Sequence, residues 1–297
     1  MVSSAKKSKI IFIVNPISGG RRGINLSSII NKRVDRNKFD FEIILTEYAG
    51  HAVEISKQKV KEETDIIVAV GGDGTINEVA ANMIGSKSIL GIIPHGSGNG
   101  LARHLSIPRI TEKAIELINL TNTTKIDTAT INGTAFISIA GLGFDAHVAN
   151  LFANSKRRGF LTYFKIIAEN YHDYKPKKYT LKLDSGRTID TEAFFISFAN
   201  SNQFGFNTSI APNAKLNDGK LDICIVKKPF LVEIPLIANL LLLRKINLSP
   251  HVEIITSSNF TVSQAENCVA NIDGEAIKLG KELHVKVKPL SLNIIIP

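Results

Sequence analysis

The sequence predicts a doubly wound α/β domain followed by a β-rich domain that folds as a sandwich. Three observations predict this division of the 297 residues: strand and helix patterns alternate only in the first part of the chain, glycine is concentrated before residue 100, and phenylalanine is concentrated after residue 130. The polar, non-periodic stretch at 121–130 marks the expected boundary. We therefore expect one domain over 1–126 and a second over 127–287.

The first domain contains three short β-branched runs, at 9–15, 65–70 and 89–93, that are typical of strands buried on both faces. Each run is followed by a glycine-rich turn and a helical pattern. After Gly74 the apolar residues recur at helical spacing, and Thr75 with Glu78 matches a capping box at the start of that helix. Repeated strand–turn–helix units predict a parallel sheet.

The second domain is predicted to consist mainly of antiparallel strands. Asn132-Gly133 and Ser185-Gly186 each separate two alternating runs and predict hairpin turns. Further alternating runs continue to the end of the chain and favour a sandwich. Helical patterns at 159–171 and 229–243 interrupt the strands.

The net charge, the cysteine count and the length of the apolar runs limit the classes of function that this chain can have. Lys plus Arg exceed Asp plus Glu by 36 − 27 = +9, with a pI near 9.4, so an anionic partner is favoured. Nucleic-acid binding is supported by this charge alone and is not predicted. The two cysteines exclude a disulfide-rich scaffold, and Cys224 is expected to be a buried core thiol. No stretch approaches about 18 uninterrupted apolar residues, so we expect no transmembrane segment and a cytoplasmic protein.

Glycine-rich turns follow all three runs of the first domain, at 15–20, 71–75 and 94–100. Glycine allows a backbone to approach a phosphate closely, and a helix N-terminus supplies free N–H groups. Parallel strands would bring the three turns to one edge of the sheet. Asp73 is a costly neighbour for phosphates unless it binds a metal or accepts a proton, which favours phosphoryl transfer. Singly, each turn is also explained as a plain loop; no Walker or GxGxxG motif is present.

Two motifs of the second domain carry candidate catalytic and metal-binding groups. Asp-Gly at 273–274 is typical of an ordinary hairpin turn, and Glu275 beside it is a candidate general base toward a substrate hydroxyl. The turn at 215–220 places Asp218 among backbone carbonyls, a set of oxygen ligands that suits Mg²⁺.

Two segments are candidates for contact with lipid. Basic residues alternate with aromatic residues over 156–178, which suits an anionic bilayer surface as well as a solvated helix face. The apolar run at 229–243 is too short to span a bilayer, so a core helix is the first expectation there. Contact with lipid chains is the second.

Five motifs run across nearly the whole chain: NPISGG at 15–20, GGDGTINEV at 71–79, PHGSGNGLARHL at 94–105, KLNDGKLD at 215–222 and IDGE at 272–275. Together they resemble the diacylglycerol kinase catalytic-domain superfamily, in its bacterial lipid kinase branch, to which sphingosine and ceramide kinases are related. GGDGT alone is shared with NAD kinases, whereas the full set is much more specific.

The resemblance implies an N-terminal nucleotide-binding domain and a C-terminal sandwich for the lipid, with ATP and Mg²⁺ in a cleft between them. It also implies that the last strand, about 288–297, returns to the first domain. Glu275 would be the proton acceptor, and Asp73 would act in catalysis or bind Mg²⁺. A structural Mg²⁺ would be held by Asp218 and the backbone carbonyls of Lys215 and Lys220. The residues transferred as ATP contacts are Asn15, Pro16, Ser18, Gly19, Thr46, Gly72, Asp73, Gly74, Thr75, Ile76, Asn77, Glu78 and Ser97.

One departure from the family pattern means that the sequence does not decide which lipid accepts the phosphate. Relatives acting on diacylglycerol often have Asn-Asp where this chain has Asn99-Gly100, and the sequence here is closer to the sphingosine and ceramide kinase form. Both diacylglycerol-like and sphingoid- or ceramide-like acceptors therefore stay as hypotheses.

Our hypothesis from the sequence is an ATP-dependent lipid kinase that associates peripherally with an anionic membrane surface to reach its lipid, with a homodimer as a further hypothesis. One alternative is a soluble-substrate kinase of the NAD kinase type, which activity on NAD without lipid would favour. Another is a non-catalytic, nucleotide-responsive lipid-binding protein, which would bind nucleotide without turnover.

Overall fold

The computed structural model describes residues 7–20, 25–96, 98–155, 159–205 and 208–297. Contacts divide the chain into two compact units, one formed by residues 1–126 with 290–297 and the other by 127–289. Each unit is described by itself. Among the described residues, no helix has the length and apolar character needed to cross a membrane.

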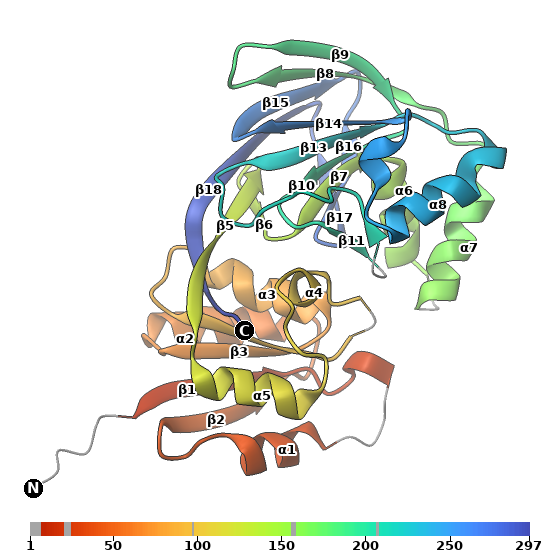
Figure 1. Cartoon of the computed structure of the whole chain (residues 1–297). Helices are drawn as coiled ribbons and strands as arrows, with labels where there is room; N and C mark the ends of the chain where they lie inside the picture. Colours follow the sequence, from red (N-terminus) through yellow and green to blue (C-terminus); the bar gives the residue numbers. More distant parts are fainter. Residues whose placement is uncertain (1–6, 21–24, 97, 156–158, 206–207) are drawn as a thin grey trace, which may run out of the picture. The chain divides into compact units, whose positions relative to one another are not determined.

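The first unit is built on a parallel sheet with the strand order β2-β1-β3-β4, of which Figure 1 labels β1, β2 and β3. The end of a long C-terminal strand, β18, adds to β4 in parallel through Asn293 and Ile294. These strands are β1 Ser8–Val14, β2 Phe39–Leu45, β3 Ile66–Gly71, β4 Ile89–Pro94 and β18 Glu282–Ile295.

Helices follow the strands of this sheet as the alternating pattern predicts. Contacts pair α1 with α5 and α2 with α3, so the helices form two groups against the sheet, as in a doubly wound fold. The helices are η1 Ser18–Gly20, α1 Leu26–Arg33, α2 His51–Lys61, α3 Asp73–Met83, α4 Gly100–His104 and α5 Thr111–Leu120. β3 is fully buried along its length, which explains its continuous apolar run.

The second unit is a sandwich of two largely antiparallel sheets. One sheet contains β18-β15-β8-β9, with β5 paired to β18 and β6 paired to β5, and the other has the order β14-β13-β10-β7-β16-β17. The strands not yet given are β5 Thr123–Ile131, β6 Thr134–Phe136, β7 Ile139–Gly143, β8 Lys177–Leu183, β9 Thr188–Ala193, β10 Phe195–Ala199, β11 Gln203–Gly205, β12 Thr208–Ser209, β13 Leu221–Val226, β14 Val252–Ser257, β15 Asn259–Gln264, β16 Cys268–Ile272 and β17 Glu275–Leu279. The predicted fold class is confirmed.

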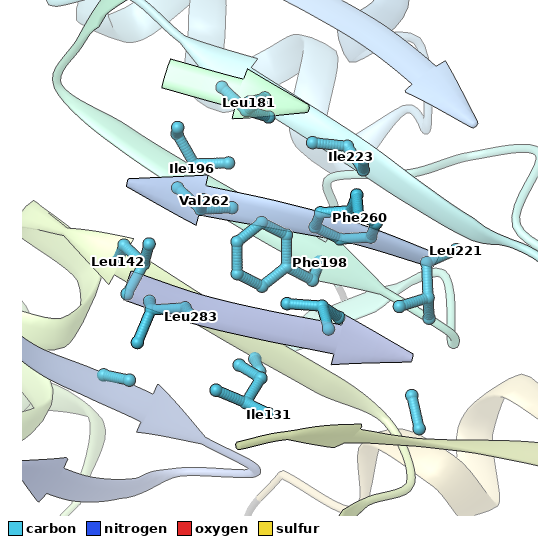
Figure 2. Close-up of a cluster of buried hydrophobic side chains, with 14 of the residues drawn as sticks. Ile131, Leu142, Leu181, Ile196, Phe198, Leu221, Ile223, Phe260, Val262 and Leu283 are labelled. Atoms are coloured by element: carbon cyan, nitrogen blue, oxygen red, sulfur yellow. The ribbon is translucent and has the colours of Figure 1, made fainter. Parts of the chain in front are cut away.

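The core of the sandwich is formed by inward-facing side chains of both sheets (Figure 2). Phe198 on β10 and Phe260 on β15 meet at its centre, with ring centroids 5.2 Å apart. Both predicted hairpins form: Asn132-Gly133 joins β5 to β6 with positive φ at both residues, and Ser185-Gly186 lies between β8 and β9. Cys224 is fully buried, as expected of a core thiol.

Among the described residues, three α-helices and two short 3-10 helices complete the second unit: α6 Phe144–Ala153, α7 Phe160–Tyr171, η2 Leu231–Glu233, α8 Ile234–Leu242 and η3 Ile246–Leu248. The helices predicted at 159–171 and 229–243 are thus present. The expectation of a core helix at 229–243 holds only in part: Ile237, Leu240 and Leu241 of α8 pack, partly buried, against a core cluster, but no residue of η2 or α8 is fully buried.

Candidate active site

The glycine-rich turns of the first unit lie together because the strands before them are parallel neighbours. Asn15, which follows β1, donates its N–H to the carbonyl of Val70 at 2.9 Å, and His95, which follows β4, donates to the carbonyl of Gly71 at 2.6 Å. Thr46, after β2, donates to the carbonyl of Val14 at 2.9 Å. The carboxyl ends of these strands therefore form one edge, which is where open α/β sheets bind ligands.

Glycine is required where these turns approach one another. A Cβ on Gly96 would lie 2.6 Å from the Cα of Gly72, so the two turns meet backbone to backbone. Gly19 has φ +73°, and a Cβ there would lie 2.8 Å from the carbonyl oxygen of His95. Turns this close leave main chain rather than side chains at the surface of the edge, as phosphate sites require.

Asp73 holds the turn after β4 against the turn after β3. Its Oδ2 accepts the N–H of Asn99 and its Oδ1 accepts the N–H of Gly100, both at 2.7 Å. A Cβ on Gly98 would lie 2.5 Å from the same Oδ2. Both carboxylate oxygens therefore accept main-chain hydrogen bonds at the start of α4, and Asp73 fixes the position of one turn relative to the other.

Asn15 and Asn99 fix the shapes of their own turns. Asn15 donates from Nδ2 to the Thr75 hydroxyl at 3.1 Å, and its Oδ1 accepts the N–H of Ile17 at 3.1 Å. The Ser18 hydroxyl donates to the Asn15 carbonyl at 2.8 Å. Asn99 is buried with φ 56° and closes a ring with Gly96 by two side-chain hydrogen bonds. These contacts give Asn15, Ser18 and Thr75 structural roles.

The predicted capping box is wrong, since α3 begins at Asp73 with Gly72 as its N-cap and no side chain caps it. Thr75 lies inside the first turn instead. Ile76 is buried in the core and donates its N–H to the Gly72 carbonyl at 3.0 Å. As ATP contacts, Ile76 and the other transferred residues of the first unit stay predictions, and Ser97 lies outside the described residues.

The IDGE motif forms the tight hairpin between β16 and β17. Asp273 and Gly274 have φ of 49° and 94°, and the Asp273 carboxylate accepts the N–H groups of Ile137, Ser138 and Ile139 at 2.7, 2.9 and 2.9 Å. The ordinary-turn interpretation is therefore confirmed for Asp-Gly. Glu275 follows as the exposed first residue of β17, and its role as a proton acceptor stays a prediction.

Sequence reasoning did not single out Asp145, a buried carboxyl near this hairpin. Its Oδ2 accepts a hydrogen bond from Nδ2 of Asn271 at 2.8 Å, and a Cβ on Gly141 would lie 2.5 Å from that oxygen. Burial raises the pKa of Asp145 to about 6, which the hydrogen bond from Asn271 offsets only in part. Gly141 leaves space for the Asp145 carboxyl because it has no side chain. No short-range sequence pattern indicates that Gly141 and Asp145 lie against each other.

Asp145→Asn is expected to become more stable relative to the wild type as pH rises. The folded-state pKa lies above the usual value near 4, so the wild type loses stability between about pH 4 and pH 6 as the folded carboxyl is forced to ionise, whereas Asn cannot ionise. Between pH 4 and pH 7.5, we expect the unfolding free energy of the variant to rise by about 1–3 kcal/mol relative to that of the wild type. Denaturant titrations at both values measure it, and a pH-independent difference would contradict the assignment.

The turn at 215–220 is ordered by Asp127, a second carboxyl that sequence reasoning did not single out. Asp127 is buried, its Oδ2 accepts the N–H of Gly219 at 2.7 Å, and its own N–H donates to the carbonyl of Leu216 at 2.6 Å. Asp218 accepts the N–H of Lys220 at 3.1 Å. The predicted metal ligands are therefore held in one tight turn of the second unit.

The charges at this turn fit a hard cation. Burial, and then the charge of Asp218, raise the pKa of Asp222 to about 6. Two neighbouring carboxylates and backbone carbonyls are all oxygen ligands, which Mg²⁺ prefers. Within the described part of the chain, no three acidic, histidine or cysteine side chains form a metal cluster, and Lys215, Asp218 and Lys220 stay predictions as Mg²⁺ ligands.

Comparison with known proteins places both units in one family. The diacylglycerol kinase catalytic domain model matches residues 9–131, and the model of the YegS C-terminal NAD kinase beta sandwich-like domain matches residues 138–296. The chain belongs to the bacterial diacylglycerol kinase and YegS-like lipid kinase family.

Individual relatives agree over almost the full length. The chain is 30% identical over 276 residues to a diacylglycerol kinase of Bacillus subtilis, covering 91% of this chain and 90% of the relative. It is 28% identical over 263 residues to a probable YegS-like lipid kinase of Klebsiella pneumoniae, covering 87% and 86%. The crystal structure of a putative diacylglycerol kinase from Bacillus anthracis superposes with a TM-score of 0.80 at 24% identity, covering 98% and 97%, which shows a shared fold.

Proposed function

We propose that this protein is an ATP-dependent lipid kinase that transfers the γ-phosphate of ATP to a lipid hydroxyl. The observation that carries the proposal is the set of glycine turns that Asp73 holds together at the carboxyl edge of the parallel sheet. Main-chain N–H groups and a helix N-terminus at such an edge suit the phosphates of a nucleotide. Family membership supports kinase chemistry, and the relatives' names support a lipid acceptor.

The reaction needs one nucleophile, one leaving group and one proton acceptor. The lipid hydroxyl oxygen attacks the γ-phosphorus, the bond from that phosphorus to the bridging β–γ oxygen breaks, and ADP departs with the bonding electrons. The hydroxyl proton passes to a carboxylate. Catalysis in this class is mainly positioning and charge stabilisation, which fits a site built from main chain and few side chains.

Glu275 is the better candidate for the proton acceptor, and Asp73 for holding the site together. The oxygens of Asp73 already accept two main-chain N–H groups. Glu275 is exposed at the start of β17 and is free to meet a substrate hydroxyl. A general base must lie within hydrogen-bond reach of the proton it takes, and an exposed carboxylate meets that need without breaking existing bonds.

Mg²⁺ would supply positive charge that neutralises phosphate and carboxylate oxygens. We place a structural Mg²⁺ at Asp218 with the carbonyls of Lys215 and Lys220, where it would relieve the repulsion between Asp218 and Asp222. This chain's own contribution there is the tight turn that Asp127 orders.

A transfer assay tests the function directly. Protein is incubated with γ-labelled ATP and Mg²⁺ in mixed micelles of diacylglycerol, sphingosine or ceramide, and in parallel with NAD and no lipid. Labelled lipid product supports the proposal and identifies the acceptor class. Label on NAD alone would favour the soluble-substrate kinase, and nucleotide binding with no labelled product would favour the non-catalytic lipid-binding protein.

Gly96→Ala is expected to lower ATP affinity by about tenfold or more, because the new Cβ would force apart the turns after β3 and β4. Calorimetric titration with ATP measures the affinity. Gly280→Ala is the matched control, since its Cβ meets no atom within 4 Å. Unchanged ATP affinity in Gly96→Ala would contradict the placement of the phosphates, provided circular dichroism shows that both variants are folded.

The membrane part of the proposal rests on an exposed apolar patch in the second unit. Its members lie on η2 and α8 and in the residues flanking them: Phe230, Leu231, Val232, Leu236, Leu242 and Leu243. α7 lies beside this region (Figure 1), and the Tyr171 hydroxyl donates to the Pro229 carbonyl at 2.5 Å. α7 also exposes Leu161 and Phe164. Exposed Arg244 and Lys245 follow the patch directly, which suits an anionic bilayer.

Replacing both Val232 and Leu236 by Asp is expected to lower binding to anionic vesicles by about tenfold or more, because two charges would have to enter the apolar part of the bilayer. Vesicle sedimentation measures binding, and activity on a short-chain, monomeric acceptor is expected to persist. Leu120→Asp, an exposed leucine of the first unit, is the control. Equal sedimentation of the double variant and the wild type would exclude the patch as the membrane contact.

A further inference from the structure

A cavity of about 690 Å³ in the second unit has no part in the proposed transfer reaction. Its walls come from α6, from β8 and the segment before it, and from the β16–β17 hairpin with the residues that flank it. The lining residues that matter for its chemistry are Tyr174, Lys177, Tyr179, Gln264, Cys268 and Lys278. All of them lie in the described part of the chain.

The lysine side chains that line the cavity give it a positive charge. Lys177 begins β8 and Lys278 lies on β17, and no Asp or Glu is among the lining residues. Carboxamides of Asn150, Gln264 and Asn267 add hydrogen-bond donors to the same walls. Burial raises the pKa of the Cys268 thiol, and the hydrogen bond with Gln264 and the nearby charge of Lys177 offset that shift only in part. The cavity is therefore basic and rich in donors.

The wall also contains a buried donor that has no partner. Tyr179 is 2% exposed, and within the described residues its hydroxyl forms no hydrogen bond. The hydroxyl lies against Gly143, where a Cβ would come within 3.1 Å of it. An unpaired buried hydroxyl costs free energy, and an acceptor atom that enters the cavity would remove that cost.

We propose that this cavity binds a phosphate ester. A phosphate group offers three acceptor oxygens and close to two negative charges, which match the two ammonium groups, the Tyr179 hydroxyl and the carboxamides. The volume exceeds that needed by a bare phosphate and leaves room for the organic part of the ligand. The same chemistry is found in free phosphorylated metabolites and in phospholipid headgroups.

Cys268 allows occupancy of the cavity to be measured without an activity assay. The chain has two cysteines; Cys224 is fully buried, whereas Cys268 is partly exposed and lines the cavity. Neutral iodoacetamide at mildly alkaline pH is expected to label Cys268 first, and mass spectrometry reports the rate. The probes are inorganic phosphate, glycerol 3-phosphate and a short-chain phosphatidylglycerol below its micelle concentration, with glycerol as the uncharged control.

We expect at least one phosphate probe to slow labelling of Cys268 and glycerol to leave it unchanged. Glycerol 3-phosphate alone would identify a free metabolite, and the phospholipid alone a headgroup. Replacing both Lys177 and Lys278 by Gln is expected to raise the apparent Kd by about tenfold or more, and Tyr179→Phe by about threefold.

Lys182→Gln is the matched control, because it removes a lysine of the same strand that does not line the cavity. Calorimetric titration with the same probes provides a second measurement if substitution alters the labelling rate itself. The proposal is overturned if no phosphate probe protects Cys268 at millimolar concentration, or if the double glutamine variant binds the probes as well as the wild type does.

Discussion

Asp73→Asn is expected to lower kcat for lipid phosphorylation by about a hundredfold or more while the protein stays folded. An amide offers one acceptor oxygen where the carboxylate offers two, so either the Asn99 or the Gly100 N–H loses its partner and meets an NH₂ group instead. The charge that orders the turn after β4 is lost at the same time. Site geometry and electrostatics are the main sources of catalysis in phosphoryl transfer, so both losses act on the rate.

The measurement compares kcat, KM for ATP and the unfolding free energy of this variant with those of Asp65→Asn. Asp65 also accepts a main-chain N–H, from Lys9 at 2.8 Å, but it precedes β3 and so lies at the opposite end of that strand. Both variants are expected to lose similar stability, and only Asp73→Asn to lose activity. Full activity of Asp73→Asn would refute the proposed site.

Glu275→Gln is expected to lower kcat by about a hundred- to ten-thousandfold, the usual effect of removing a general base, with little change in KM for ATP. Glu275 is exposed and glutamine has nearly the same size and shape, so the free energy of unfolding should stay within about 0.5 kcal/mol of the wild type.

The control for this variant is Glu282→Gln, at the exposed start of β18 in the same unit. It should keep wild-type activity. An unchanged kcat in Glu275→Gln would show that Glu275 is not the proton acceptor, and Asp73 would be the next candidate. The proposed kinase function itself would still stand.

Local sequence patterns predicted the elements whose burial or backbone conformation is visible in the types of consecutive residues. β3 has a continuous apolar run because both its faces are buried, and the Asn132-Gly133 turn has the positive φ values that only such residues tolerate easily. β2, by contrast, was not predicted. It is the edge strand of its sheet and alternates polar with apolar residues irregularly, so it lacks the apolar run of a central strand.

The start of α3 was predicted wrongly because the capping rule considers only local hydrogen bonds. Thr75 has the right residue type and spacing for a cap, but its hydroxyl accepts a hydrogen bond from Asn15, 60 residues earlier. The helix begins at Asp73, two residues before Thr75. At 229–243 the apolar composition suggested a core helix, whereas α8 packs only Ile237, Leu240 and Leu241 against a core cluster and exposes Leu236 and Leu242.

The sequence by itself located the glycine-rich turns of the proposed site, because a glycine-rich turn between a buried strand and a helix is a local feature that residue type specifies. Only the tertiary structure decided how those turns are fixed and which carboxyls are buried. Asp73 meets Asn99, and Asp145 meets Asn271 across 126 residues. Such pairs form because buried polar groups must find partners, and the partner is chosen by the packing of strands that lie far apart in the chain.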